Sequence, residues 1–263
     1  MQTGNPIRTT NYNKKRVALQ VLCIYLLFIP AAGHSQYAAI VVNADNGDII
    51  HAINTNHLWY PASLTKVMTL YLTFKALKSG QIYLQDKLIV SQQAANQPET
   101  RLGLKQGESL TMEQVILAVA IRSANDAAYM LAEHLAKTEK SFAAKMTEQA
   151  LALGMNNTVF LNATGLPNNK QVTTARDMAI LAKALLHDFT EYYQYFSVSN
   201  FTFREKNYSN INPILNAYSG ADGIKTGFTC GAGYNLMASA ERNKQRLIAI
   251  LLGAENSQER TRE

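Results

Sequence analysis

The sequence predicts an α/β fold of the α+β type, in which strands from both ends of the chain form one sheet around an inserted helical lobe. Strand patterns occur early, at residues 37–42 and 49–53, and late, at residues 223–230, 234–240 and 246–252. The stretch between them carries apolar residues at the spacing of amphipathic helices. Early strands, a helical middle and a late antiparallel set together predict one sheet that pairs the chain ends.

A hairpin and a long helix are expected at the start of the fold. Residues 37–42 read as a buried strand, and the turn Asp45-Asn46-Gly47-Asp48 returns the chain into residues 49–53. A helix then begins near Ser63 and ends at Gly80. Its apolar residues recur at helical spacing: Leu64, Val67, Met68, Tyr71, Leu72 and Phe74.

The middle of the chain is expected to be mostly helical. Thr111 and Gln114 form a capping box in front of the apolar run 115–121. Thr174 caps a later helix, and a turn-rich loop precedes it at residues 162–173. The remaining expected elements are helices at residues 127–136, 141–153 and 175–186 and a short strand at residues 201–204.

The first 33 residues have the pattern of a secretory signal peptide. Lys14, Lys15 and Arg16 precede a 13-residue apolar run, 17–29, that only Gln20 interrupts. Thirteen residues fall short of the ~20 that a membrane-spanning helix needs. We therefore expect a signal peptide at residues 1–33, one exported domain at residues 34–263, and a location in the periplasm or at the outer face of the cytoplasmic membrane.

Charge and cysteine content exclude several classes of function. The chain has a net charge of +6, but residues 1–33 hold four basic residues and no acid. Residues 34–263 therefore carry 21 basic against 19 acidic residues, a net charge of +2, which does not indicate nucleic-acid binding. Cleavage would leave Cys230 alone, so no intramolecular disulfide is expected. The five histidines are scattered, and neither a metal nor a cofactor is expected.

Three short motifs occur once each and in one order. They are Ser63-Leu64-Thr65-Lys66, Ser123-Ala124-Asn125 and Lys225-Thr226-Gly227. A chain of this length holds about one S-x-x-K and about one S-x-N by chance, whereas K-T-G occurs in fewer than about one such chain in ten. The set of three is the signature of serine acyl-transfer sites in penicillin-binding proteins and class A β-lactamases.

The first motif supplies a nucleophile and its base. Serine is a weak nucleophile until a neighbouring base takes its proton. Ser63 and Lys66 are three residues apart at the start of a helix, so they lie on one face. Lysine acts as a base only when burial or a nearby cation lowers its pKa, and Lys225 would be such a cation.

The other two motifs supply a proton relay and a substrate anchor. The Ser123 hydroxyl can pass a proton between the lysine and the leaving group, and the Asn125 amide can hold either Lys66 or a substrate carbonyl. Asp126 is expected to cap the following helix. On the predicted strand, Lys225 and Thr226 can hold a carboxylate.

The same strand offers a close approach to the backbone. Gly227 has no side chain, so an extended substrate can lie against the strand. The N–H groups of Ser63 and Phe228 could together form an oxyanion hole.

These residues and their neighbours resemble the low-molecular-mass penicillin-binding proteins, specifically the D-alanyl-D-alanine carboxypeptidases. The similarity extends over about residues 37–253. It is carried by the stretches PASLTKVMT at 61–69, SANDAA at 123–128, TTARD at 173–177, DGIKTGF at 222–228 and GAGYNL at 231–236.

The resemblance implies a five-stranded antiparallel sheet flanked by helices, with a helical subdomain. It implies that peptidoglycan stem peptides ending in D-Ala-D-Ala acylate Ser63, with Lys66 as the base, and that β-lactams inhibit the enzyme covalently. Ser123 and Asn125 would assist, and residues 225–227 would line the site. Arg260 or Arg262 could contribute to the carboxylate pocket.

The resemblance also implies a last helix of the catalytic domain that starts near Ser257, and it marks a difference in length. Many relatives carry a further C-terminal β-domain and an amphipathic membrane-anchoring helix. We expect that β-domain to be absent or truncated here, with any membrane association not encoded in residues 34–263.

Three alternatives to a carboxypeptidase remain. A class A β-lactamase uses a glutamate-held water for deacylation, but loop 162–173 contains no Glu or Asp. A peptidoglycan DD-endopeptidase cuts crosslinks by the same chemistry. A catalytically inert wall-binding homologue would be expected to lack Ser63, Lys66 or Lys225, and all three are present.

Overall fold

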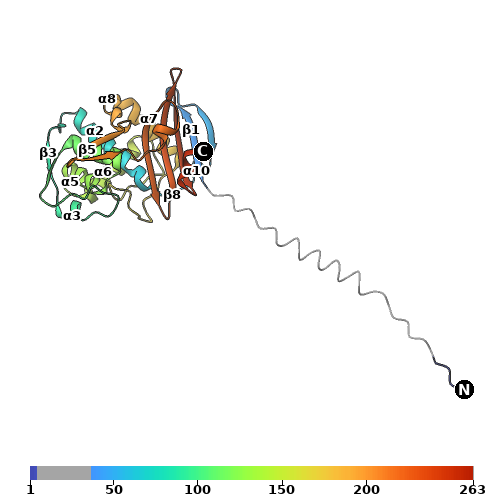
Figure 1. Ribbon diagram of the computed structural model, residues 1–263. Coiled ribbons are helices and arrows are strands. Elements are labelled where there is room, and N and C mark those ends of the chain that lie inside the picture. The colour runs from blue at the N-terminus through green and yellow to red at the C-terminus, as the bar shows by residue number, and fades with distance from the viewer. Residues whose placement is uncertain (5–36, 263) are drawn as a thin grey trace. The chain divides into compact units, whose positions relative to one another are not determined.

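A five-stranded antiparallel sheet joins the two ends of the domain (Figure 1). The computed structural model describes residues 1–4 and 37–262, so the predicted signal peptide lies almost entirely outside the described residues. The strand order β2-β1-β9-β8-β7 confirms the prediction that early and late strands share one sheet. The strands are β1 (Ala38–Asn43), β2 (Ile49–Ile53), β7 (Ala221–Thr229), β8 (Gly233–Arg242) and β9 (Gln245–Ala254).

The pairing of β1 with β9 closes the domain. Ala38 lies opposite Leu252 and Asn43 opposite Leu247, so the first strand of the fold is registered against the last. Strand β7 lies at one edge of the sheet and pairs on one side only, with β8. This leaves the other edge of β7 open toward the helical lobe.

The inserted lobe is helical, as predicted. A 3₁₀ turn, η1 (Ala62–Leu64), leads into α2 (Thr65–Lys78). The capping box predicted at Thr111 is present at the start of α4 (Met112–Arg122). The other longer helices are α5 (Asn125–Ala136), α6 (Glu139–Ala152) and α7 (Ala175–Asp188).

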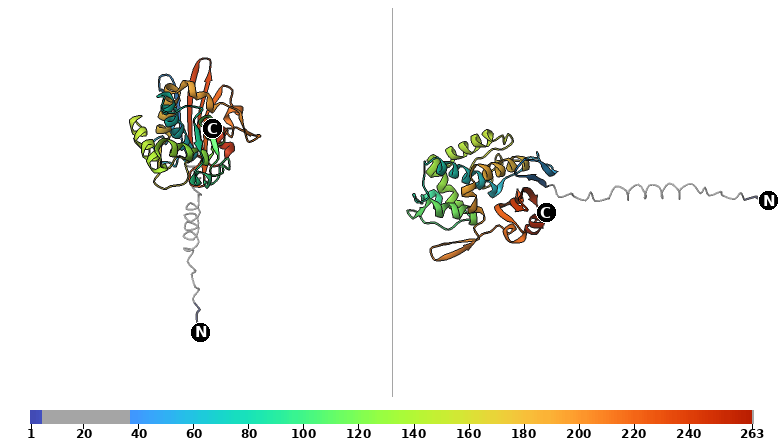
Figure 2. Two further views of the ribbon diagram at one scale, coloured as in Figure 1. Left: turned by 90° about the vertical axis from the view of Figure 1, so that its left-hand side faces the viewer. Right: turned by 90° about the horizontal axis from the view of Figure 1, so that it is seen from above.

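Most of the short elements were not predicted from the sequence, whereas the helix expected near Ser257 is present as α10 (Ser257–Arg262). Each has three to six residues, too few for a periodic pattern to stand out. In the β5–β6 hairpin only the first strand was expected, and this hairpin projects from the lobe (Figure 2). The short elements are β3 (Lys87–Ile89), α3 (Gln92–Ala95), β4 (Ser109–Thr111), α8 (Thr190–Tyr193), η2 (Gln194–Phe196), β5 (Asn200–Phe203), β6 (Lys206–Ser209), α9 (Ile214–Ala217) and α10 (Ser257–Arg262).

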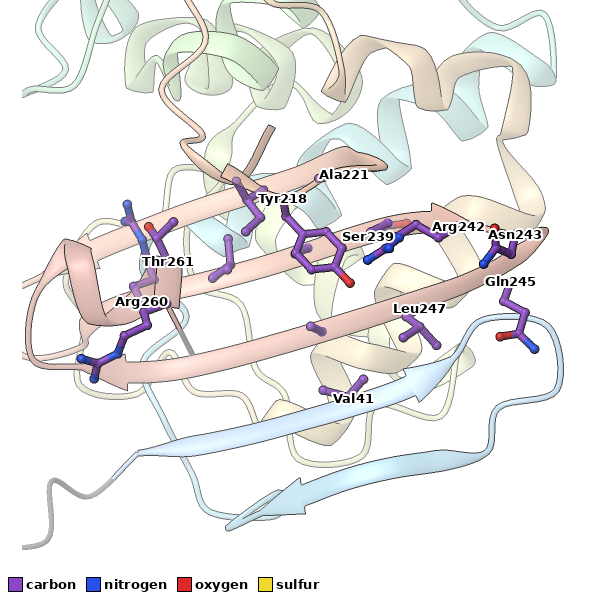
Figure 3. A pocket seen from close by; sticks show the side chains of 16 residues that line it. Val41, Tyr218, Ala221, Ser239, Arg242, Asn243, Gln245, Leu247, Arg260 and Thr261 are labelled. Atoms are coloured by element: carbon purple, nitrogen blue, oxygen red, sulfur yellow. The ribbon is translucent and has the colours of Figure 1, made fainter. Parts of the chain in front are cut away.

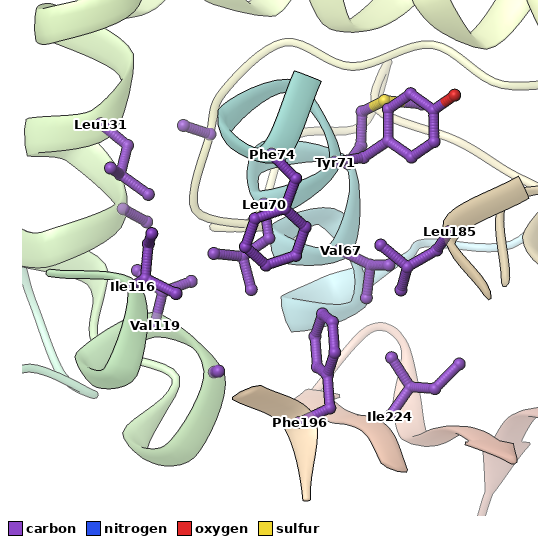
Figure 4. Close-up of a cluster of buried hydrophobic side chains, with 14 of the residues drawn as sticks. Val67, Leu70, Tyr71, Phe74, Ile116, Val119, Leu131, Leu185, Phe196 and Ile224 are labelled. Atoms are coloured by element: carbon purple, nitrogen blue, oxygen red, sulfur yellow. The ribbon is translucent and has the colours of Figure 1, made fainter. Parts of the chain in front are cut away.

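Helix α2 lies at the centre of the hydrophobic core. Its side chains Val67, Leu70 and Phe74 are fully buried. Figure 4 shows them surrounded by side chains from α4 and α5 on one side and from α7, η2 and β7 on the other. Because α2 packs against α4, α5, α6 and α7, the residues at its start are held in place.

The outer face of the sheet carries a smaller apolar cluster and a hollow of about 490 Å³. Figure 3 shows Arg260 and Thr261 of α10 at one end of this hollow, Arg242 and Asn243 at the other, and Tyr218 over the middle. None of the described helices is long and apolar enough to cross a membrane.

Candidate active site

The three sequence motifs meet in one pocket of about 450 Å³ between the open edge of β7 and the helical lobe. Ser63 comes from η1, Ser123 and Asn125 from the α4–α5 junction, and Thr226 and Gly227 from β7. The pocket is completed by three loops, by the end of β7 and by α10, through residues Glu99, Thr100, Thr164, Gly165, Leu166, Pro167, Ile211, Phe228, Thr229 and Arg260.

The turn that carries Ser63 is held between two glycines. Ala62, just before the nucleophile, has a left-handed φ of 48°, which an alanine rarely adopts. A Cβ on Gly227 would lie 3.1 Å from the Ser63 nitrogen, and one on Gly165 would lie 1.9 Å from the Ala62 oxygen. Strand β7 and loop 162–167 therefore both contact the turn; a Cβ at Gly165 would overlap its backbone, and a Cβ at Gly227 would be a tight contact.

Lys66 lies beneath Ser63 and is completely buried. Its Nζ is 3.1 Å from Ser63 Oγ and also donates to the Thr164 carbonyl. Burial lowers the pKa of Lys66 well below its usual value, and the charge of Lys225 lowers it further, whereas Asp126 opposes the change. A lysine with a lowered pKa can hold the neutral form that takes a proton from serine.

Lys225 is also buried, and it is not among the residues that line the pocket. Its Nζ donates to the Thr226 carbonyl at 3.0 Å. Burial, followed by the charge of Arg260, lowers the pKa of Lys225 to about 7. Of the strand motif, Thr226 and Gly227 face the pocket, while Lys225 acts on it through its charge.

Ser123 ends helix α4 in a left-handed conformation, with φ of 59°. This conformation turns the chain sharply and places a buried hydroxyl in the pocket wall. Within residues 37–262, Ser123 Oγ has no hydrogen-bond partner. A buried hydroxyl without a partner is costly unless it serves a ligand, so Ser123 is suited to passing a proton to a bound molecule.

The side chains of Asn125 and Asp126 are directed by a loop. Asn125 Nδ2 donates to the Pro98 carbonyl at 3.0 Å, whereas the hydrogen bonds of Lys66 go to Ser63 and Thr164. The prediction that Asp126 caps helix α5 is wrong, because Ala124 occupies the N-cap position. The Asp126 carboxylate instead accepts backbone N–H groups from residues 102–104.

Arg260 is the cation that faces this pocket. Only 8 % of the residue is exposed, and its Nε has no partner within the described part of the chain. The guanidinium lies 5.7 Å from the centre of the Tyr234 ring, which packs against Phe228 with ring centroids 4.3 Å apart. Of the two arginines considered from the sequence, Arg260 lines the pocket, whereas Arg262 lines neighbouring hollows.

The residues that sequence reasoning missed act through their backbone or their position. The Thr164 carbonyl accepts from Lys66, and Gly165 packs against the nucleophile's turn. A backbone carbonyl has no signature in the sequence. Gly165 lies in a turn-rich loop, and the sequence gives no indication that it differs from an ordinary turn glycine. Within the described residues no group of three or more His, Cys, Asp or Glu is placed to hold a metal ion.

A serine paired with a buried lysine, beside a second hydroxyl and an open strand edge, defines a serine acyl-transfer site. A family model described as D-alanyl-D-alanine carboxypeptidase matches residues 30–256. The chain belongs to this D-alanyl-D-alanine carboxypeptidase family, which confirms the family and the fold that the sequence motifs predicted.

Curated relatives agree over most of this chain. It is 36 % identical to the D-alanyl-D-alanine carboxypeptidase DacF of Bacillus subtilis over 238 residues, which are 86 % of this chain and 59 % of DacF. It is 39 % identical to DacC of Escherichia coli over 233 residues, which are 86 % of this chain and 58 % of DacC. The chain thus spans less than two thirds of the length of these relatives.

Solved structures share the fold. Penicillin binding protein 5 from Haemophilus influenzae superposes with a TM-score of 0.83 at 34 % identity, covering 85 % of this chain and 67 % of that one. Penicillin-Binding Protein D2 from Listeria monocytogenes, in its ampicillin-bound form, gives a TM-score of 0.77 at 29 % identity, covering 86 % of this chain and 92 % of that one.

Proposed function

We propose that this protein is a serine D-alanyl-D-alanine carboxypeptidase that removes the terminal D-alanine from peptidoglycan stem peptides. The observation that carries the proposal is the Ser63–Lys66 pair, 3.1 Å between Oγ and Nζ, in which the lysine is fully buried and the serine lines the pocket. Family membership and the names of the relatives support the same substrate class.

In the acylation step, neutral Lys66 takes the proton of Ser63 while Oγ attacks the carbonyl carbon of the penultimate D-alanine. In this proposal the backbone N–H groups of Ser63 and Phe228 stabilise the negative oxygen that develops. Protonated Lys66 then returns this proton, by way of the Ser123 hydroxyl, to the nitrogen of the departing D-alanine. This step breaks the peptide bond, leaves an ester on Ser63 and restores neutral Lys66.

In the deacylation step, water takes the place of the leaving amine. Lys66 accepts a proton from the water, whose oxygen attacks the ester carbonyl, and Ser63 recovers its hydroxyl. A β-lactam reacts through the same first step, but its opened ring stays attached to the acyl group. We therefore expect penicillins to form a longer-lived ester on Ser63, and the ampicillin-bound relative supports this expectation.

The substrate's terminal carboxylate fits the end of the pocket where Thr226 and Arg260 lie. Arg260 is nearly buried and its Nε lacks a partner in the described residues, so a carboxylate would satisfy a cation that water reaches poorly. Lys225, buried next to Thr226 in β7, adds positive potential when it is protonated, and burial lowers its pKa to about 7. Asn125 faces the same pocket and is suited to holding a substrate amide.

This activity requires a location where peptidoglycan is exposed. We infer that the protein acts outside the cytoplasmic membrane, in the periplasm or at the membrane's outer face. The signal-peptide pattern in residues 1–33 supports export, and the relatives' function in the cell wall supports an envelope location.

Purified protein mixed with a penicillin and analysed by mass spectrometry tests the proposal directly. We expect one acyl adduct on Ser63, and none on the Ser63→Ala variant with an unchanged circular dichroism spectrum. Unmodified Ser63 in folded protein would refute the proposal. A parallel assay with a D-Ala-D-Ala pentapeptide and a crosslinked muropeptide identifies the reaction: released D-alanine supports a carboxypeptidase, and crosslink cleavage would assign an endopeptidase instead.

A further inference from the structure

Asp126 is a fully buried carboxylate one residue after the Ser123–Asn125 motif. Its Oδ1 accepts the N–H of Leu102 at 3.1 Å, and its Oδ2 accepts those of Gly103 at 2.9 Å and Leu104 at 3.1 Å. Oδ1 also accepts the N–H of Ala127 at 2.9 Å. Both oxygens are therefore committed to backbone donors, three of which come from one loop. Because these bonds are charge-assisted, they are stronger than bonds between neutral groups.

The same loop also forms hydrogen bonds with Ser123 and Asn125 of the second motif. Thr100 Oγ1 donates to the Ser123 carbonyl at 2.9 Å, and Asn125 N donates to the Thr100 carbonyl at 2.7 Å. Asn125 Nδ2 donates to the Pro98 carbonyl at 3.0 Å. Since Thr100 also lines the pocket, loop 98–104 is both a wall of the site and the support of its relay residues.

The outer side of this loop is fastened by the β5–β6 hairpin. Arg204 in the hairpin turn forms an ion pair with Glu108 and donates to the Gly103 carbonyl at 3.2 Å. These groups are partly exposed, so their contribution is small in water. Asp126 provides the buried attachment and Arg204 the solvent-facing one.

Asp126 also acts on Lys66 through its charge. Burial and Lys225 lower the pKa of Lys66, and Asp126 is the acid that raises it. The charged groups acting on Lys66 are thus one cation on β7 and one anion in the first turn of α5. A change of charge at Asp126 is therefore detectable at Lys66 even if the loop stays in place.

We propose that Asp126 is a positioning residue, which holds loop 98–104 against the site so that Thr100 fixes Ser123 and Asn125 in their working orientation. The proposal rests on the proposed acyl-transfer function of Ser63. Without the carboxylate, the three loop N–H groups lose their acceptor, and the wall of the pocket separates from the relay residues.

The test is Asp126→Asn in the full chain, measured as the second-order rate of Ser63 acylation by a fluorescent penicillin from pH 5 to 10. The amide has nearly the shape of the carboxylate, but its NH₂ group would face loop N–H donors. We expect a fall of about tenfold to a hundredfold, because a displacement near 1 Å costs that much. We also expect the acid limb of the pH profile to move to lower pH, since the anion that raises the pKa of Lys66 is gone.

Asp177→Asn is the matched control. Asp177 is a buried aspartate in the first turn of α7, and its Oδ2 accepts Asn157 N at 2.8 Å and Thr158 Oγ1 at 2.7 Å. The Asp177→Asn variant is expected to lower the melting temperature as much as Asp126→Asn does. It is expected to leave the acid limb of the pH profile where it is in the unsubstituted protein. Equal changes of rate and profile in the two variants, compared at equal folded fraction, would show that Asp126 acts only through stability.

Thr100→Val keeps the test decisive if Asp126→Asn does not fold. It removes the hydroxyl that holds the Ser123 carbonyl, so acylation is expected to fall, and Thr100→Ser is expected to restore it. Where both single variants fold, their effects should be less than additive, because they act through one loop. Unchanged acylation in Asp126→Asn and Thr100→Val, with normal labelling of the unsubstituted protein, would overturn the proposal; absent labelling of that protein would instead refute the proposed function.

Discussion

Gly165→Ala is the most direct test of how the nucleophile's turn is held. Gly165 has a φ of +81°, and an added Cβ would lie 1.9 Å from the Ala62 oxygen and 2.9 Å from the Ser63 nitrogen. Because real Cβ atoms essentially never approach other heavy atoms within 3.0 Å, the loop and the turn must separate by about 1.1 Å. That separation moves Ser63 and the Thr164 carbonyl that holds Lys66.

The expected cost has two parts that can be measured separately. A left-handed conformation costs an alanine about 1–2 kcal/mol, and relief of the overlap costs about 1–3 kcal/mol more. The free energy of unfolding should therefore fall by about 2–5 kcal/mol. A displacement near 1 Å at the reacting atoms is expected to slow acylation about 100-fold. Urea unfolding gives the first quantity, and the rate of fluorescent-penicillin labelling gives the second.

Gly154→Ala is the control for the backbone term alone. Gly154 has a φ of +88° and nothing within 4 Å of its added Cβ. It should lose about 1–2 kcal/mol of stability and keep the acylation rate of the unsubstituted protein. Full acylation activity in Gly165→Ala would refute the reasoning, because the nucleophile's turn would then tolerate the displacement of its supporting loop.

Three further outcomes are expected. Lys225→Met removes a cation that lowers the pKa of Lys66, so the acid limb of the acylation pH profile should move to higher pH. The effect should be largest below about pH 7, where Lys225 is charged. An acid limb that does not move would contradict this electrostatic role. Arg260→Met should raise KM for a D-Ala-D-Ala peptide much more than for the same peptide with a C-terminal amide, as measured by D-alanine or D-alaninamide release. Phe74→Ala, at the centre of the core, should lower the free energy of unfolding by about 3–5 kcal/mol in urea titrations, whereas exposed Tyr83→Ala should change it by less than about 0.5 kcal/mol.

The longer elements were predictable because their signals are local. The turn at residues 45–48, the strand Ile49–Ile53 and the Thr111 capping box depend on neighbouring residues alone, and each was predicted where it is found. The pairing of early with late strands was predicted from the order of the elements, because two strands at the start and three at the end enclose a helical middle. Strands of three residues such as β3 and β4 exist because they pair with each other, and nothing within three residues reveals a partner 20 positions away.

Asp126 shows where the local signal misleads. A short acidic residue at the start of a helix is typical of a cap, but the α5 cap position falls on Ala124. The carboxylate turns instead to three N–H groups that lie more than 20 residues earlier in the chain. The packing of that loop against α5 brings these N–H groups to the Asp126 carboxylate, which would otherwise be hydrated by water.

By itself, the sequence determined which groups could carry the chemistry: a serine three residues from a lysine, a second serine beside an asparagine, and a lysine and threonine before a glycine. The tertiary structure decided how those groups behave. It buries Lys66 beside Ser63, buries Lys225 within β7 and brings Arg260 to the pocket. The reason is physical: a side chain's type is set by the sequence, but the pKa of a lysine depends on its desolvation and on charges that only the folded chain brings near.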